Sequence, residues 1–376
     1  MSQLAPAADV RDHRFGAGLP YTVGIEEEYM LLDPLTFDLA PGAEGILRAE
    51  SGGEFAAHIS PELFDSLIEF HTGVCDGVPE AGRELRRLRR CASEAAAAQG
   101  LRLGSAGTHP FGLFERERIM RRDRYQGLID QLQYAGRREL IYGLHVHVAV
   151  DDPDRAIRIV NALRSHLCEL VALSANSPFW RGEPTGLASC RPLIFAAFPR
   201  SGPPPHFRDY EEYAGVITQM VSSGCIEDYT RTWWDVRPHP RFGTVEVRAM
   251  DAVTRVEEAI ALAAYVQALV RRYASVRNSC HPVIAQENKW RAARYGLDAT
   301  VVDPAGGGAV SLRGLIERTL GELGPHAREL GCADELDGVR AILSDGNGAA
   351  RQLRAYAAGG NVREVVRGVA ELTYSG

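Results

Sequence analysis

The sequence predicts an α+β fold in which an antiparallel β-sheet carries helices gathered on one of its sides. Segments that alternate polar and apolar residues, as half-buried strands do, recur along the chain of 376 residues. Longer segments with a helical spacing of apolar residues separate them. The two kinds of segment alternate without the compact spacing of β-α-β units, so the pattern favours an antiparallel sheet over a parallel one.

Five segments have the composition and the alternation of β-strands. The first of them ends at Asp33 and Pro34, a pair that is typical of turns. The fourth has the sequence IYGLHVHVAV, in which polar and apolar residues alternate. The predicted strands cover residues 21–32, 63–72, 101–106, 141–150 and a part of 230–250.

Local start and stop signals delimit four helices. Gly100 is a good stop for the first helix. Asp152 and Pro153 form an N-cap and first-turn pair for the third helix. Thr254 and Glu257 have the spacing of a capping box for the fourth helix. The predicted helices cover residues 79–99, 125–140, 153–173 and 256–273, and the chain from about residue 281 onward is mostly helical.

The chain divides into a short lead-in and one large folded unit. Residues 1–19 are rich in Ala, Gly and charged residues without periodicity, which predicts a flexible N-terminal segment. We expect residues 20–376 to form a single α+β domain, although the length also allows two tightly joined lobes. Residues 176–207 carry many Pro, Gly and Arg residues and predict a long ordered loop, which inside a compact domain is usually functional.

The composition is that of a soluble globular protein. Apolar residues make up 45% and charged residues 24% of the chain. The net charge of −7 argues against nucleic acid or an anionic membrane as the main partner. No apolar run reaches the roughly 20 residues that span a bilayer, and no export signal opens the chain. Seven cysteines without any CxxC pair suit a reducing cytosol, so we expect a cytoplasmic protein.

Two glutamates of the first strand point to a metal ion. Residues two apart in a strand face the same way, so Glu26 and Glu28 share one face. Two carboxylates this close repel each other and are costly to ionise on a concave surface. A divalent cation removes that cost, and hard oxygen ligands suit Mg²⁺ or Mn²⁺ better than a soft metal.

The same parity recurs in three other predicted strands. Each of them places polar side chains on one face and apolar side chains on the other. If the four strands share a sheet, their polar face is a plausible cradle for a metal-bound polyphosphate. The polar sets are Glu69 with His71, His145 with His147, and Thr244 with Glu246 and Arg248.

Each of these patterns is weak when it is taken alone. E-x-E occurs on many solvent-facing strands, and T-x-E-x-R is more often an exposed cross-strand ion pair. Glu27 lies on the opposite, apolar face, and we expect it to reach solvent at an edge of the sheet. The run of arginines at 83–90 is interpreted as the solvated face of the first helix rather than as a phosphate site.

Seven ordered motifs resemble the carboxylate–amine ligases of the glutamate–cysteine ligase type 2 family. The resemblance extends from about Tyr21 to Gly296, and TWWDVRP is its most specific core. The motifs are GIEEEY at 24–29, DSLIEFHT at 65–72, GSAGTHP at 104–110, GLHVHV at 143–148, ANSPFW at 175–180, TWWDVRPHPRFGTVEVR at 232–248 and ENKWRAARYG at 287–296.

The resemblance implies a fold, an activity and a set of site residues. The implied fold is that of the glutamine synthetase catalytic domain, a curved antiparallel sheet with helices on its outer side. The implied activity is ATP-dependent amide formation with Mg²⁺ or Mn²⁺, with glutamate and cysteine as the default substrates. Family members tend to be oligomeric, so a homodimer is expected. Carried over by position, the implied metal ligands are Glu26, Glu28, Glu69, Glu246 and His145. The resemblance implies that His147 contacts the nucleotide. It also implies that Arg248 faces the transferred phosphoryl group and forms the catalytic pair with Glu246.

The chemistry of such a ligase suggests further residues. A carboxylate attacks the γ-phosphoryl group of ATP to give an acyl phosphate, which an amine then cleaves. The acid substrate needs a cation, for which Arg191 and Arg200 in the long loop are candidates. That loop, with Trp180, is a candidate lid that protects the acyl phosphate from water.

Two assignments in the TWWDVRP motif are open between substrate binding and structure. Trp234, like Trp233, either lines the substrate site or packs in the core. Asp235 and Arg237 are expected to pair with each other.

Two rival functions remain open at this stage. In the first, the H-x-H pair of His145 and His147 holds a catalytic zinc ion with a glutamate, as in a hydrolase. In its favour is the H-x-H spacing, and against it is the excess of carboxylates over histidines. In the second, the chain is a catalytically silent relative that binds nucleotide. Release of ADP only in the presence of a carboxylic acid would separate a ligase from both.

Overall fold

A seven-stranded sheet forms the centre of the molecule. The computed structural model describes residues 9–278 and 280–374. The strand order is β10-β11-β5-β1-β3-β2, with β4 paired to β1 beside the main path, and every pairing is antiparallel. The predicted antiparallel sheet is therefore confirmed. Its strands are β1 Val23–Leu32, β2 Ile59–Pro61, β3 Leu67–His71, β4 Arg102–Gly104, β5 Gly143–Ala149, β10 Val236–His239 and β11 Thr244–Asp251.

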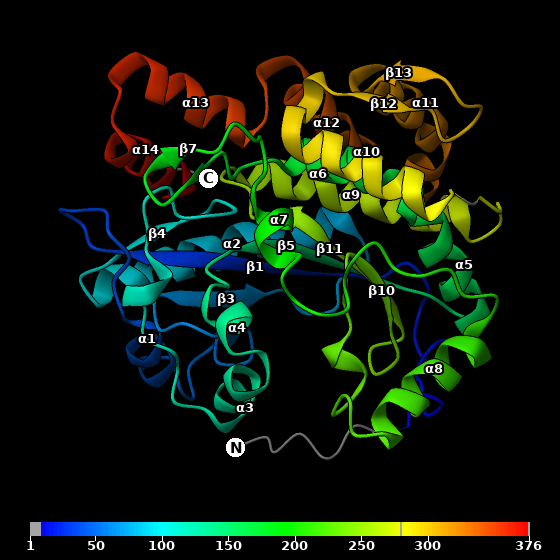
Figure 1. Cartoon of the computed structure of the whole chain (residues 1–376), viewed down its shortest axis with the longest axis horizontal. Coiled ribbons are helices and arrows are strands. Elements are labelled where there is room, and N and C mark those ends of the chain that lie inside the picture. The colour runs from blue at the N-terminus through cyan, green and yellow to red at the C-terminus, as the bar shows by residue number, and fades with distance from the viewer. Residues whose placement is uncertain (1–8, 279, 375–376) are drawn as a thin grey trace.

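Most of the helices cover one face of this sheet. In Figure 1 the long α9 and the C-terminal helices lie above the sheet, and α3, α4 and α8 lie below it. The helices are α1 Ala43–Ala49, α2 Val78–Ala98, α3 Asp123–Leu132, α4 Tyr134–Arg137, α5 Pro153–Leu163, α6 Leu167–Ser174, α7 Arg191–Phe195, α8 Tyr210–Ser222, α9 Val256–Tyr273, α10 Pro282–Tyr295, α11 Leu312–Leu330, α12 Ala333–Asp345, α13 Gly348–Gly359 and α14 Val362–Tyr374. Among the described residues, no helix combines the length and the apolar character that crossing a bilayer requires.

Shorter elements complete the fold. Three small two-stranded sheets pair β6 Phe179–Trp180 with β7 Glu183–Pro184, β8 Ser201–Gly202 with β9 Trp233–Trp234, and β12 Thr300–Val302 with β13 Ala309–Ser311. Short 3₁₀ turns cover Phe114–Arg116, Arg164–His166, Tyr229–Arg231 and Gly296–Asp298.

The main core lies between the apolar face of the sheet and the covering helices. Ile25, Val146 and Val247 are completely buried there, together with apolar residues of α5, α6 and α9. Because side chains alternate along a strand, burying these residues turns their neighbours to the opposite face. The polar residues of β1, β3, β5 and β11 therefore share that opposite face.

Several predicted element boundaries need correction. The helix expected at 125–140 is two helices, since Gln133 takes a left-handed φ of 51° between α3 and α4. The capping box was also wrong, because the Thr254 hydroxyl donates to the Ser105 carbonyl and makes no cap bond. The Asp152 cap is confirmed by its bond from the Arg155 N–H at 2.7 Å. Residues 1–8 of the predicted flexible segment lie outside the described residues, and Val10 and Phe15 are packed in the core.

The first strand is anchored from its apolar side by a buried ion pair. Glu27 and Arg89 are each only 1% exposed, and Arg89 Nε donates to Glu27 Oε2 at 2.9 Å. The Tyr29 hydroxyl donates to the same carboxylate. The expectation that Glu27 reaches solvent was wrong, because α2 covers this side of β1. The interpretation of 83–90 as a solvated face fails at Arg89 for the same reason.

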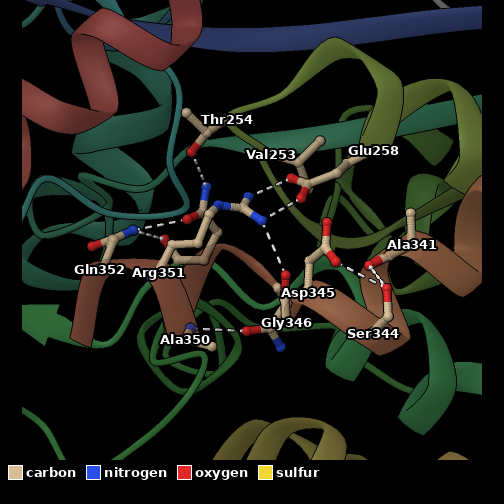
Figure 2. Close-up of polar contacts among 12 residues, drawn as sticks. Val253, Thr254, Glu258, Ala341, Ser344, Asp345, Gly346, Ala350, Arg351 and Gln352 are labelled. Carbon is tan, nitrogen blue, oxygen red and sulfur yellow. Dashed lines mark hydrogen bonds and ion pairs between the residues drawn. The ribbon is translucent and has the colours of Figure 1, made fainter. Parts of the chain in front are cut away.

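The C-terminal helices are tied to α9 and to the start of the 176–207 loop. Figure 2 shows the Arg351 guanidinium of α13 pointing at the Glu258 carboxylate of α9, with Arg351 Nη2 and Glu258 Oε2 2.7 Å apart. The next residue, Gln352, donates to Asn176 Oδ1 at 2.8 Å. Asn176 in turn donates through Nδ2 to the Ala252 carbonyl at 2.8 Å. The C-terminal part of the chain therefore fixes one end of the candidate lid.

Candidate active site

Four neighbouring strands bring their polar side chains to one face of the sheet. β11, β5, β1 and β3 lie side by side in Figure 1. Glu26 stands opposite His145 on one side and His71 on the other, and Glu28 stands opposite Glu69. Glu246 stands opposite His147 in the next pair of strands. The parity of the strands thus places the polar residues of all four in one array.

Glu26 binds both histidines of the H-x-H pair. Its carboxylate lies 3.0 Å from His145 Nδ1 and 3.3 Å from His147 Nε2. Burial opposes ionisation of Glu26, but the two histidines outweigh it and hold its pKa well below the usual value. His147 Nδ1 lies 3.0 Å from the Thr244 hydroxyl. Burial lowers the pKa of His147, and the Glu26 carboxylate more than compensates, so that this pKa is raised.

In the part of the chain that the structure describes, two sets of donor atoms are close enough to hold metal ions. Glu26, Glu69 and His145 offer one set, and Glu28, Glu62 and Glu69 offer the other, with the ligand atoms of each set within 4.8 Å of one another. Glu69 belongs to both sets. Two ions sharing the Glu69 carboxylate would therefore fit this arrangement.

The chemistry of these donors fits Mg²⁺ or Mn²⁺. Burial, followed by the Glu26, Glu62 and Glu28 carboxylates, raises the pKa of Glu69 well above its usual value. Burial and the Glu28 carboxylate raise the pKa of Glu62 to about 8. Carboxylates crowded in this way need a cation to stay ionised together. Both sets are dominated by hard oxygen atoms, which Mg²⁺ and Mn²⁺ prefer.

Glu62 was not predicted from the sequence. It directly follows β2, in which Ser60 stands opposite Glu69. Ser60 and Glu62 are two residues apart, so the parity that located the other ligands also applies to them. Pro61 between them is unusual within a strand, and it concealed the short β2.

Two arginines hold Glu246 outside both sets of metal-binding donors. Arg237 Nε donates to Glu246 Oε2 at 2.7 Å, and Arg248 Nη1 donates to Glu246 Oε1 at 2.9 Å. Burial opposes its ionisation, but the two guanidinium groups keep the pKa of Glu246 far below the usual value. The expected pairing of Asp235 with Arg237 was wrong, because Asp235 accepts two bonds of 2.7 Å from Lys289 instead.

A third arginine of the site comes from the 176–207 loop. Arg191 is buried at the start of α7 and donates through Nη1 to the Arg248 carbonyl at 3.3 Å. The guanidinium carbons of Arg191 and Arg248 both lie 5.9 Å from the centre of the Phe195 ring. A Cβ atom at Gly143 would lie 2.5 Å from Arg191 Nη2 and 3.0 Å from His145 Nε2. The lack of a side chain at Gly143 thus lets Arg191 approach the metal-binding strands.

The other three predicted substrate residues occupy different surroundings. Trp180 is half-buried and packs on the apolar cluster that contains Phe195. Arg200 donates to the Arg231 carbonyl and lies over the Trp233 ring, rather than among the carboxylates. Trp234 packs against Phe207 and Tyr213 in the main core. These contacts give Trp234 a packing role.

Several residues of the site have buried polar atoms without a hydrogen-bond partner. Among the described residues, His145 Nε2, Arg191 Nε and Arg248 Nε are buried and make no hydrogen bond. Both carboxylate oxygens of Glu139, which precedes β5, are in the same state. Buried polar groups in native proteins are nearly always satisfied, so a group of unpaired ones indicates the place of a bound ligand.

Comparison with known proteins places the chain in one family. Residues 22–368 match the profile of the "Glutamate-cysteine ligase family 2". A relative from Rubrobacter xylanophilus, named "Putative glutamate--cysteine ligase 2-3", is 44% identical over 96% of this chain and 99% of its own length. A relative from Gloeobacter violaceus, named "Putative glutamate--cysteine ligase 2", is 40% identical over 93% of this chain and 95% of its own length.

Solved structures share the fold at low sequence identity. The glutamate–cysteine ligase of Francisella tularensis, determined in complex with AMP, is 14% identical with a TM-score of 0.70, covering 96% of this chain and 90% of its own. A bifunctional glutathione synthetase from Pasteurella multocida, also 14% identical, has a TM-score of 0.68 and covers 95% of this chain and 52% of its own. The predicted fold class and the resemblance in the motifs are both confirmed. The chain belongs to the glutamate–cysteine ligase family 2.

Proposed function

We propose that this protein is an ATP-dependent carboxylate–amine ligase that forms an amide bond through an acyl phosphate. One observation carries the proposal: Glu26, Glu28, Glu62, Glu69 and His145 form two adjacent sets of donor atoms on one face of the sheet. Family membership supports C–N ligase chemistry. With L-glutamate as the acid and L-cysteine as the amine, the product would be γ-glutamylcysteine.

The side chains around the metal-binding sets match the needs of phosphoryl transfer. Mg²⁺ bound to these carboxylates would neutralise the charge of the β- and γ-phosphate oxygens. Arg248 donates through Nη1 to Glu246, whereas its Nε has no partner among the described residues. Its planar guanidinium can therefore bind a phosphate oxygen while Glu246 holds the arginine in position. His147, fixed between Glu26 and Thr244, is assigned to the nucleotide side of the site.

Arg191 is proposed to bind the carboxylate of the acid substrate. Its Nε is buried and has no partner among the described residues, and its guanidinium lies over the same Phe195 ring as that of Arg248. The acid would thereby lie next to the phosphoryl group that it attacks. The segment around α7 covers this position and would exclude water from the acyl phosphate.

The zinc hydrolase receives less support from this geometry. Of the H-x-H pair, only His145 belongs to a set of metal-binding donors, and its companions are the carboxylates of Glu26 and Glu69. A hydrolytic zinc site usually draws on two or three histidines. The excess of carboxylates favours a harder ion.

The fate of one oxygen atom tests the proposed function. The protein is incubated with ATP, Mg²⁺ and each of the twenty amino acids as acid and as amine, and ADP release is measured. For the most active pair, the acid is labelled with ¹⁸O in its carboxyl group. Attack on the γ-phosphoryl group predicts one ¹⁸O atom in each phosphate that is released. Unlabelled phosphate would refute the acyl phosphate, and ATP binding without acid-dependent ADP release would favour the silent relative.

A further inference from the structure

Glu139 is a buried acid that neither the metal-binding sets nor the phosphoryl-transfer groups use. It lies between α4 and β5 and is only 9% exposed. Both of its carboxylate oxygens are buried, and neither has a hydrogen-bond partner among the described residues. Leaving such a group unpaired is expensive, because burial removes its water and nothing replaces it.

Glu139 lies four residues before Gly143, the first residue of β5, beside which the Arg191 guanidinium packs. Arg191, Glu28 and Arg248 are all close enough to affect its ionisation. Burial raises the pKa of Glu139 to about 8, although the Arg191 guanidinium acts in the opposite direction. Among the described residues, Arg191 Nε and Arg248 Nε are likewise buried and without a hydrogen-bond partner. This part of the site thus has two guanidinium groups for anions and one unpaired carboxylate for a cation.

We propose that Glu139 binds the ammonium group of the incoming amine substrate and places its nitrogen next to the activated carboxyl group. This inference rests on the proposed ligase function. An ammonium group offers three N–H donors, which would satisfy both oxygens of Glu139. The positive ammonium group would also balance the negative charge of ionised Glu139, to which neither Arg191 nor Arg248 donates a hydrogen bond.

The same position suits the proton that the amine must lose. Glu139 accepts one proton from the ammonium group, and the lone pair that this exposes attacks the acyl phosphate carbon. The C–N bond forms as the C–O bond to phosphate breaks, and the leaving phosphate takes the second proton of the nitrogen. The products are the amide, hydrogen phosphate and protonated Glu139. A carboxyl group whose pKa lies near the working pH can both accept a proton and give it up again, as this exchange requires.

Hydroxylamine separates amine binding from acid activation. It is uncharged near neutral pH and traps an acyl phosphate as a hydroxamate, so it needs no carboxylate to bind or deprotonate it. Glu139→Gln keeps the size of the side chain and removes its charge. With the most active acid–amine pair, we expect this variant to lose about 10- to 100-fold in kcat/KM for the amine, the effect of one hydrogen bond to a charged group. Hydroxamate formation should stay close to the wild-type rate.

Controls distinguish this role from a structural one. Glu139→Asp keeps the charge and should recover part of the amine reaction. Asp130→Asn, an exposed acid on the neighbouring α3, should change neither rate. The Glu139→Gln protein should also melt close to the wild-type temperature, since one buried polar group replaces another of the same size.

Two results would overturn the inference, and a third would overturn its basis. Equal losses of amide and hydroxamate formation in Glu139→Gln would assign Glu139 to acid activation or to folding. Unchanged amide formation would remove it from the site. Failure of the wild-type protein to form any hydroxamate or ADP would instead refute the ligase function itself.

Discussion

Replacing Arg89 by Met should destabilise the protein strongly without touching the polar face of the sheet. Arg89 is the buried partner of Glu27 and also donates to the carbonyls of Thr254, at 2.6 Å, and Val253, at 3.0 Å. Methionine fills a similar volume but leaves the Glu27 carboxylate buried with the Tyr29 hydroxyl as its one remaining side-chain partner among the described residues. Removing one member of a buried ion pair typically costs about 3–5 kcal/mol.

The melting temperature gives the expected size of this effect. Unfolding entropy is about 2.1 cal/mol/K per residue, so a chain of 376 residues changes by about 0.8 kcal/mol per degree near its midpoint. A loss of about 3–5 kcal/mol then lowers the melting temperature by about 4–6 °C. Differential scanning calorimetry measures this directly.

Two controls decide whether the buried charge is the cause. Arg87→Met removes an exposed ion pair with Glu54 from the same helix and should lower stability by about 1 kcal/mol at most. The double variant Glu27→Gln with Arg89→Met removes both charges and should recover part of the loss. The reasoning would be refuted if the Arg89→Met and Arg87→Met proteins had the same melting temperature.

Three further predictions concern pH, the C-terminal helices and catalysis. Glu62 and Glu139 have pKa values near 8, so each binds its proton more tightly in the folded state than in the unfolded state. The metal-free protein should therefore lose stability as the pH rises from about 6.5 to about 8, above the range in which the buried His109 and His239 titrate, and Mg²⁺ should reduce that loss in thermal melts. Arg351→Met breaks the ion pair with Glu258 drawn in Figure 2 and should lower the free energy of unfolding by about 3–5 kcal/mol. The control Arg340→Met breaks an exposed ion pair and should lower it by about 1 kcal/mol or less. Equal effects of the two substitutions would contradict the buried geometry of the Arg351 pair. Arg248→Lys keeps the charge but loses the fork, so ADP release should fall sharply yet stay measurable, and an unchanged rate would remove Arg248 from the catalytic groups.

The strand period explains how much of the site could be predicted from the sequence. Side chains two residues apart in a strand must face the same way. This rule places Glu28 on the same face as Glu26 without any tertiary information. The antiparallel order of the strands then brings His145 opposite Glu26 and Glu69 opposite Glu28. These residues were predicted because the rule that places them is local.

The residues that were missed depend on contacts between distant parts of the chain. Glu139 falls within the helix predicted at 125–140, but in the structure it lies in the connection between α4 and β5, where no local rule gives the direction of its side chain. Parity correctly put Glu27 on the apolar face, but only the packing of α2 shows that this face is covered there and that Arg89 meets it. Asp235 likewise binds Lys289, 54 residues away in α10, rather than the nearer Arg237.

Divalent metal binding at the carboxylate cluster tests the central claim most directly. Isothermal titration of the protein with Mn²⁺ measures it without any knowledge of the substrates. Glu69 belongs to both sets of donors, so Glu69→Gln should weaken Mn²⁺ binding by about 10- to 100-fold, while the exposed control Glu94→Gln should bind as the wild type does. Equal Mn²⁺ affinity in wild type and Glu69→Gln would contradict the assignment of this face as the metal site.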